Sequence, residues 1–208
     1  MSSSVLWYTS QATGLVCLVL FTAVMVLGVA VRTQRRLPGL PRFGTVALHR
    51  SISLLAMAFL ALHVATSVAD SYVDISLVSV LLPFASAYQP LWIGLGAVAV
   101  DLMLAVVATS LLRDRLGRRA WRAVHWLAYA SWPVAVLHGF GLGSGEGGLM
   151  NGWELWLTGG CVLAVAAAVA WRLAERRRDL TPARVLQAAD AAKSPEPVGA
   201  GARGGGRL

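Results

Sequence analysis

Five long apolar stretches constrain the fold of this chain more than any other feature. They cover residues 12–31, 45–69, 91–112, 121–142 and 153–171. A helix needs roughly 20 apolar residues to cross the hydrocarbon core of a bilayer, and each stretch is of that order. Charged residues make up 13% of the chain, whereas soluble domains carry about 25%. The sequence therefore predicts an all-α, polytopic membrane bundle with five transmembrane helices.

Arginines gather in the segments that follow the first, third and fifth apolar stretches, at 32–42, 113–122 and 172–178. The segments after the second and fourth stretches carry few charges, and these are mostly acidic. Because cationic loops stay on the cytoplasmic side, this pattern predicts an N-terminus outside and a C-terminus in the cytoplasm. It also accounts for the net charge of +8 without a nucleic-acid partner.

Three further segments complete the predicted organisation of a multi-pass protein in a cell membrane. No Lys or Arg precedes the first apolar stretch, so we expect a retained helix and not a cleaved signal peptide. Residues 75–85 are apolar but too short to span, and we expect an interfacial or re-entrant segment. Residues 1–173 should form the membrane domain. Residues 174–208, rich in Ala, Gly and Pro, should form a cytoplasmic, largely disordered tail in which only 182–189 has the pattern of a short helix.

All four histidines of the chain fall on the second and fourth apolar stretches. His49 and His63 lie on one, and His125 and His138 lie on the other. An ionisable residue inside a spanning helix is a functional candidate. Spacings of 14 and 13 residues separate the members of each set by about 20 Å along a helix. The two stretches should run in the same direction, so His49 and His125 form an inner pair near the cytoplasm, and His63 and His138 form an outer pair.

Imidazoles paired at two depths are typical of axial ligands to haem iron, where each iron receives one nitrogen from each helix. We predict two b-type haems, one bound by the inner pair and one by the outer pair. Covalent c-type attachment is excluded because the chain has no C-x-x-C-H. Zinc fits less well, because its ligands cluster at one point and often include Cys or carboxylate. Four separate histidines that only support helix packing are the competing interpretation.

The two spacings are not equivalent on a regular helix. Fourteen residues return a straight helix to within about 40° of its starting face, whereas thirteen miss it by about 140°. Pro133 lies between His125 and His138, and a proline removes a backbone hydrogen bond and kinks a helix. A kink there, or a rotation of one haem relative to the other, would absorb the mismatch, and the sequence leaves both open.

Three charged residues accompany the histidines. Arg50 follows His49, and Arg122 lies one helical step before His125, so both could bind propionates of the inner haem. They fit an ordinary cationic cytoplasmic rim equally well. Asp101 is the carboxylate deep within a span, and we expect a structural hydrogen bond there because a charge at that depth costs about 3 kcal/mol.

The segments around the histidines resemble the ferric reductase-like transmembrane domain. That superfamily includes membrane ferric reductases, the NADPH oxidases and the haem-binding subunit of the periplasmic methionine sulfoxide reductase system. The resemblance rests on Leu-His-Arg at 48–50 with His63 fourteen residues after the first histidine. It also rests on Trp-Arg-Ala-Val-His-Trp at 121–126 with His138 thirteen residues after the second, and it covers about residues 7–173.

The resemblance implies two bis-histidine b haems stacked across the membrane, which pass electrons from the cytoplasmic to the outer side by outer-sphere chemistry. Larger members carry a cytoplasmic flavin and nicotinamide domain after the last helix. The tail here has no G-x-G-x-x-G after a strand and is too short for such a domain. We therefore expect a separate donor: another protein, a free reduced flavin or a quinol. The outer acceptor is expected to be ferric iron or a flavin-binding or reductase protein.

The predicted function is that of the electron-transfer subunit of an oxidoreductase, with no catalytic residues of its own. A quinol-linked cytochrome b uses similar histidine spacing, but that family has more spans and a Pro-Glu-Trp-Tyr motif, which is missing here. A non-redox membrane structural protein is the second alternative, and it predicts a purified protein without visible absorption.

Overall fold

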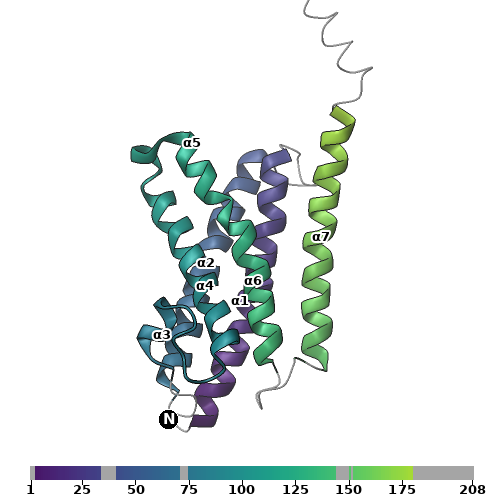
Figure 1. The fold of residues 1–208 in the computed structure, drawn as a ribbon. Helices are drawn as coiled ribbons and strands as arrows, with labels where there is room; N and C mark the ends of the chain where they lie inside the picture. Colours follow the sequence, from purple (N-terminus) through teal and green to yellow (C-terminus); the bar gives the residue numbers. More distant parts are fainter. Residues whose placement is uncertain (1–2, 34–40, 71–74, 144–149, 151, 180–208) are drawn as a thin grey trace, which may run out of the picture. The chain divides into compact units, whose positions relative to one another are not determined.

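The computed structural model of the chain describes residues 3–33, 41–70, 75–143, 150 and 152–179 (Figure 1). Its helices are α1 (Ser3–Thr33), α2 (Arg42–Ala69), α3 (Leu77–Leu81), α4 (Pro90–Leu111), α5 (Arg113–His125), α6 (Leu127–Leu142) and α7 (Trp153–Asp179). These described residues contain no strand. The prediction of an all-α fold is therefore confirmed.

Four helices are long and apolar enough to cross a membrane: Val5–Arg32, Phe43–Ala69, Pro90–Leu111 and Trp153–Glu175. They lie where the first, second, third and fifth spans were predicted, so the polytopic membrane bundle is confirmed. The fourth predicted span, residues 121–142, is divided between α5 and α6. The 16 residues of α6 extend about 24 Å, which is less than the bilayer core of about 30 Å.

The division of the fourth span has a clear cause in the sequence of α5. This helix is strongly amphipathic, because Arg118, Arg119 and Arg122 alternate with apolar residues. Residues 111–120 are all exposed. A helix with one cationic face is stable at a membrane surface and not inside the bilayer. The apolar stretch counted from residue 121 therefore begins while the chain is still at that surface.

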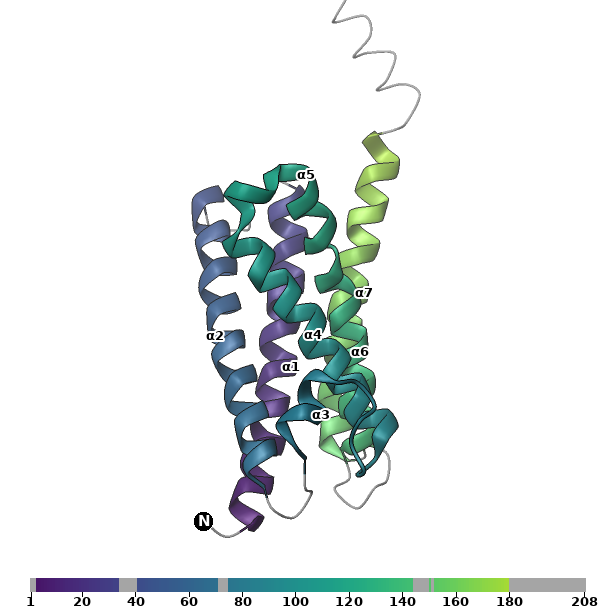
Figure 2. The same ribbon diagram turned by 60° about the vertical axis from the view of Figure 1, so that its left-hand side comes forward.

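Helices α1, α2, α4 and α6 lie side by side in both views (Figures 1 and 2). α1 packs along α2, α4 packs along α6, and α1 also contacts α6. Small residues such as Ala56 and Ala97 are fully or almost fully buried, and small residues allow helices in membranes to approach closely. The indole Nε1 of Trp132 donates a buried hydrogen bond of 3.1 Å to Thr22 Oγ1. This bond ties the α4–α6 pair to the α1–α2 pair.

The short helix α3 occupies the segment predicted to be interfacial. It packs against α4 and is followed by a turn in which Phe84 has a φ of 66°. The Phe84 ring packs against Gly94, where an added Cβ would clash with the ring. The segment is therefore held against α4 and does not span.

Two compact units divide the chain, residues 1–168 and residues 169–208, with the division inside α7. The first unit contains α1 to α6. In the second unit, α7 continues as a helix to Asp179. The rest of the predicted tail, including the short helix near 182–189, lies outside the described residues.

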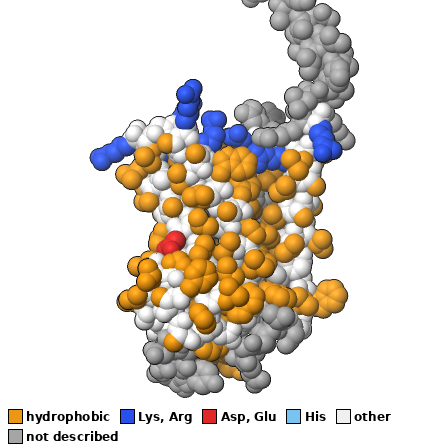
Figure 3. Space-filling model, in the orientation of Figure 1, with side chains coloured by type: hydrophobic (Ala, Val, Ile, Leu, Met, Phe, Trp, Pro, Cys, Tyr) orange, Lys and Arg blue, Asp and Glu red, His pale blue; other side chains and the backbone are white. Residues whose placement is uncertain are grey.

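Arginine side chains gather at the end of the bundle where α5 lies, and apolar side chains cover the surface beyond it (Figure 3). We call this end, which carries Arg113, Arg115, Arg118, Arg119 and Arg122 of α5, the arginine end. The chain enters it from α4 and turns at Gly117, whose φ of 75° and ψ of 159° interrupt α5. Only glycine adopts this conformation without strain.

Replacing Gly117 with alanine should therefore destabilise the protein although nothing lies within 4 Å of the added methyl group. We expect a loss of about 1–3 kcal/mol, the usual cost of such a backbone conformation in a residue with a Cβ. Thermal unfolding in detergent, followed by circular dichroism, measures it. Gly160→Ala is the matched control, because Gly160 is helical and equally open. It should leave stability unchanged or raise it by about 0.5–1 kcal/mol. Equal effects of the two substitutions would contradict the assignment of strain to Gly117.

Candidate functional site

The outer pair of histidines meets between α2 and α6. The ring centroids of His63 and His138 are 6.4 Å apart, and the ring planes are inclined by 80°. Imidazole nitrogens lie about 2 Å from the metals they bind, so two imidazoles on opposite sides of one metal have centroids roughly 6 Å apart. The two rings therefore have the separation that axial ligation of one iron requires.

Backbone carbonyls fix the tautomer of both rings. His63 Nδ1 lies 2.9 Å from the carbonyl oxygen of Ser10 on α1, and His138 Nδ1 lies 2.7 Å from that of Trp92 on α4. A carbonyl oxygen can only accept, so each Nδ1 must be the N–H donor. The lone pair then lies on Nε2, and a hydrogen bond from the other ring nitrogen is the usual support of a metal-bound histidine.

A glycine accompanies each of these carbonyls, four residues further along the same helix. An added Cβ at Gly14 would come within 3.1 Å of the His63 ring, and one at Gly96 within 2.6 Å of the His138 ring. In an α-helix the residue four positions later lies directly above the carbonyl. A side chain there would meet the ring, so glycine allows each imidazole to approach the backbone of its neighbouring helix.

Two serines add to the surroundings of His63. Ser10 Oγ and Ser67 Oγ are 2.6 Å apart, and Ser67 Oγ donates to the backbone carbonyl of His63 at 2.8 Å. These bonds join α1 to α2 beside the imidazole. They keep the Ser10 carbonyl in position to accept from the ring.

The inner pair lies towards the arginine end, and His49 and His125 are close enough to interact electrostatically. His49 faces Val24 and Gly28 of α1, which repeats the carbonyl-and-glycine pattern 14 residues after Ser10 and Gly14. The contact is looser here: a Cβ at Gly28 would lie 3.5 Å from the ring. His49 Nδ1 therefore forms no well-aligned hydrogen bond with the Val24 backbone, and His125 Nδ1 is buried without a hydrogen-bond partner.

The apolar stretch that carries His125 and His138 is interrupted directly after His125. It is not interrupted at Pro133, which lies inside α6. Trp126 N–H donates to the Ala123 carbonyl, and Tyr129 N–H donates to the Trp126 carbonyl. Such three-residue bonds tighten the helix to about 120° per residue. The tight turn shifts His125 relative to His138, so part of the mismatch of the 13-residue spacing is absorbed at the ligand itself.

More than half of this chain matches a known protein family. A model described as "Ferric reductase like transmembrane component" matches residues 13–136, which is more than half of the sequence. The chain belongs to the ferric reductase-like transmembrane family. The matched region contains His49, His63 and His125 and ends two residues before His138. No curated protein and no solved structure matches the chain significantly.

The predicted resemblance is thus confirmed. Membership of the ferric reductase-like family, with four apolar helices long enough to span, indicates a membrane protein that takes part in electron transfer with redox partners. Among the described residues of this family member, no three His, Cys, Asp or Glu side chains gather at one point. The histidines come together as pairs, which is the arrangement that a macrocycle with two open axial positions needs.

The charged residues singled out in the sequence of this ferric reductase-like domain differ in how far they are buried. Arg50 and Arg122 are both exposed, and neither forms an ion pair with another described residue. Their role towards propionates stays a prediction. Asp101 is half-buried in the middle of α4, and its expected structural hydrogen bond also stays a prediction.

The residues that support the outer pair were not predicted from the sequence: Ser10, Gly14, Trp92 and Gly96. A signal for some of them exists in the sequence. Gly14 and Gly28 are 14 residues apart on the first apolar stretch, the same spacing as His49 and His63 on the second. Two antiparallel helices with equal spacings of glycine and histidine bring each glycine against one imidazole. The pairing of Gly96 with His138 has no such partner spacing and needed the structure.

Proposed function

We propose that this chain is a di-haem b cytochrome of the membrane. His63 and His138 would bind the outer haem, and His49 and His125 the inner haem. The observation that carries the proposal is the outer pair: two imidazoles 6.4 Å apart whose Nδ1–H groups point to backbone carbonyls. Two neutral histidines that share no hydrogen bond and turn their Nε2 lone pairs away from the protein backbone fit axial ligands of one iron.

The residues present fit the group in a second respect. The helices that carry the histidines, α2 and α6, each pack on a different neighbour, α1 and α4. The supporting carbonyls lie on those neighbours. Each imidazole is therefore bonded to the partner helix of its own pair, α1–α2 or α4–α6, and its Nε2 is left for the iron. A haem iron with both axial positions filled exchanges single electrons without binding its redox partner directly.

Electrons would enter at the arginine end and leave at the opposite end. The positive-inside rule supports a cytoplasmic arginine end, and the two pairs lie about 20 Å apart along α2. The donor would be a cytoplasmic or membrane partner: a flavoprotein, a reduced flavin or a quinol. The outer acceptor would be ferric iron or a flavin-binding or reductase protein. Reduction of the purified protein by each candidate donor, followed in difference spectra, identifies the donor class.

The first test is haem content. Protein expressed with ample haem supply and purified in detergent should contain about two b haems per chain, because the chain presents one imidazole pair per iron. The pyridine haemochrome assay measures the ratio and distinguishes b from c haem. A colourless preparation would contradict the proposal.

The ferric protein should also show an electron paramagnetic resonance signal that reports ligand orientation. Axial imidazoles with planes inclined by 80° leave the two iron orbitals that accept electron density from the ligands nearly equal in energy. We therefore expect a strongly anisotropic low-spin signal from the outer haem, in place of the rhombic signal of parallel imidazoles. His63→Ala should remove this component. A spectrum that contains only rhombic low-spin signals would exclude the observed ring geometry in the holoprotein.

A further inference from the structure

The two histidine pairs are supported unequally. At the outer pair, both Nδ1 atoms donate to carbonyls on neighbouring helices. At the inner pair, the contact of His49 with the Val24 backbone is too loose for a well-formed hydrogen bond, and His125 Nδ1 has no hydrogen-bond partner. A hydrogen bond to the second ring nitrogen orients a metal-bound imidazole and raises its basicity, and its loss typically weakens metal binding 10- to 100-fold.

His125 differs most from the other three histidines. It is the last residue of α5 and precedes the tight turn into α6. Each of the other three histidine rings faces a glycine of a neighbouring helix, whereas among the described residues no glycine faces the His125 ring. A ligand at the end of a helix is held by fewer backbone bonds than one in its interior.

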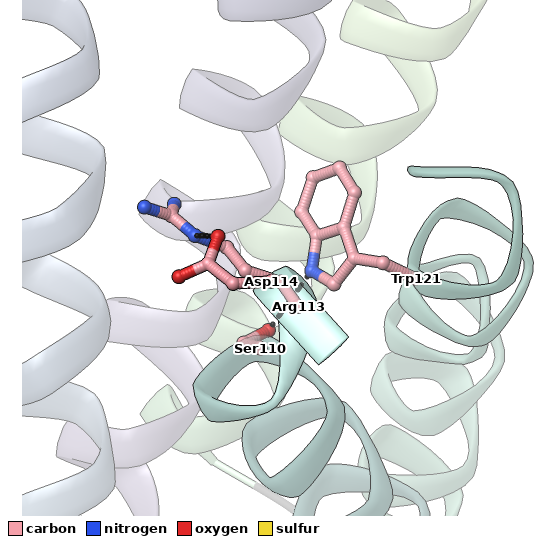
Figure 4. Close-up of polar contacts among 4 residues, drawn as sticks. All are labelled: Ser110, Arg113, Asp114 and Trp121. Carbon is pink, nitrogen blue, oxygen red and sulfur yellow. Dashed lines mark hydrogen bonds and ion pairs between the residues drawn. The ribbon is translucent and has the colours of Figure 1, made fainter. Parts of the chain in front are cut away.

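His125 contacts the aromatic ring of Trp121 instead of a backbone carbonyl. Its ring stacks on the His125 imidazole, with centroids 5.0 Å apart and an angle of 25° between the planes. Figure 4 shows how Trp121 is anchored: its indole Nε1 points to Ser110 Oγ at the end of α4, at 3.4 Å. The nearby Arg113–Asp114 pair joins two largely exposed side chains at 3.6 Å, and such a pair contributes little to stability.

We infer that His125 is an exchangeable ligand, positioned by stacking on Trp121, and that the inner haem site can therefore open to a small external ligand while the outer site cannot. This inference rests on the proposed di-haem function, and it adds that the two haem sites differ in whether a histidine ligand can be exchanged. A stacking contact allows the imidazole to slide and rotate in its plane. The two carbonyl bonds at the outer pair do not.

Carbon monoxide is the probe, because it binds ferrous haem only when an axial position is open. In the dithionite-reduced holoprotein, about half of the haem should convert to the carbon monoxide complex, which corresponds to one of two sites. The Soret shift gives the fraction. Conversion of none or of all of the haem would overturn the inference while leaving the proposed function intact, whereas absence of haem would end both.

Paired ligand deletions assign the reacting site. The variant His49→Ala/His125→Ala should keep one haem that does not react with carbon monoxide. The variant His63→Ala/His138→Ala should keep one haem that does react. The reverse pattern would overturn the inference. The wild-type fraction stands as a test of its own if either variant does not fold.

Trp121 is a positioning residue in this scheme, and its role has a separate readout. Trp121→Ala removes the stacking partner and should accelerate carbon monoxide binding by about two- to tenfold, as expected for loss of an aromatic contact. Trp121→Phe keeps an aromatic face against His125 and should bind carbon monoxide at a rate close to that of the wild type. Equal rates in the alanine variant and the wild type would overturn the assignment to Trp121.

Discussion

Replacing His138 with alanine should remove one haem and leave the other. The content should fall from about two haems per chain to about one, because the proposed outer haem would lose an axial ligand that no other described side chain can replace. His63, 6.4 Å away across the pair, would be left without a partner for the iron. The pyridine haemochrome assay measures the content, and His63→Ala should give the same result.

The neighbouring residue offers a matched control for this deletion. Leu137 lies on the same helix and is 51% exposed, so Leu137→Ala removes a side chain at the same depth without touching the pair. It should keep both haems. Two haems in His138→Ala, or loss of a haem in Leu137→Ala alone, would be incompatible with the outer pair as the ligand set.

Replacing Gly96 with alanine should abolish the outer haem although no ligand is changed. The added Cβ would lie 2.6 Å from both Cε1 and Nδ1 of His138, a distance that forces the ring to move. The imidazole would leave the Trp92 carbonyl, now 2.7 Å from Nδ1, and its Nε2 would no longer point to the iron. A hydrogen bond of this kind supports about 10- to 100-fold of metal affinity, and displacement of the ring itself adds to that loss.

Gly28→Ala is the control for this steric prediction. Its Cβ would lie 3.5 Å from the His49 ring, which is ordinary van der Waals contact, so both haems should be retained. Gly14→Ala is intermediate at 3.1 Å and should weaken the outer haem without abolishing it. Haem titration of the three variants gives the order of affinities. An order that does not follow these distances would show that the glycines are not set by the imidazoles.

These predictions share one structural theme, which is that the supporting helices matter as much as the ligand helices. α2 and α6 carry the histidines, but the carbonyls that fix the outer rings belong to α1 and α4. The buried bond from Trp132 to Thr22 connects the α4–α6 pair to the α1–α2 pair at a level between the two histidine pairs. A variant on α1 or α4 should therefore weaken the proposed outer haem site without removing a ligand.

Much of the fold followed from hydropathy and charge. The spans predicted at 12–31, 45–69, 91–112 and 153–171 all correspond to helices long enough to cross a membrane. The span at 121–142 was predicted as one helix, because a window of apolar residues does not register the cationic face of α5 that overlaps its start. Hydropathy is an average over a window of residues. The position of the helix break depends instead on which arginines of α5 must stay at the membrane surface.

The pairing of the histidines was also predictable in part. Equal depth followed from the spacings of 14 and 13 residues and from the alternation of the spans. The difference in hydrogen bonding between the two pairs was not predictable, because it depends on which backbone atoms of α1 and α4 face each ring. Nothing in the local sequence of His125 or His138 distinguishes a ring stacked on Trp121 from one bonded to the Trp92 carbonyl.

The sequence by itself determined that this chain is a helical membrane protein with two sets of histidines at two depths, because helix length and the cost of burying charge in lipid depend only on residue order. Only the tertiary structure decided how each imidazole is held. Tautomer and ring orientation depend on contacts within about 3 Å between residues far apart in the chain, such as His138 and Trp92, and such contacts exist only after the helices have packed.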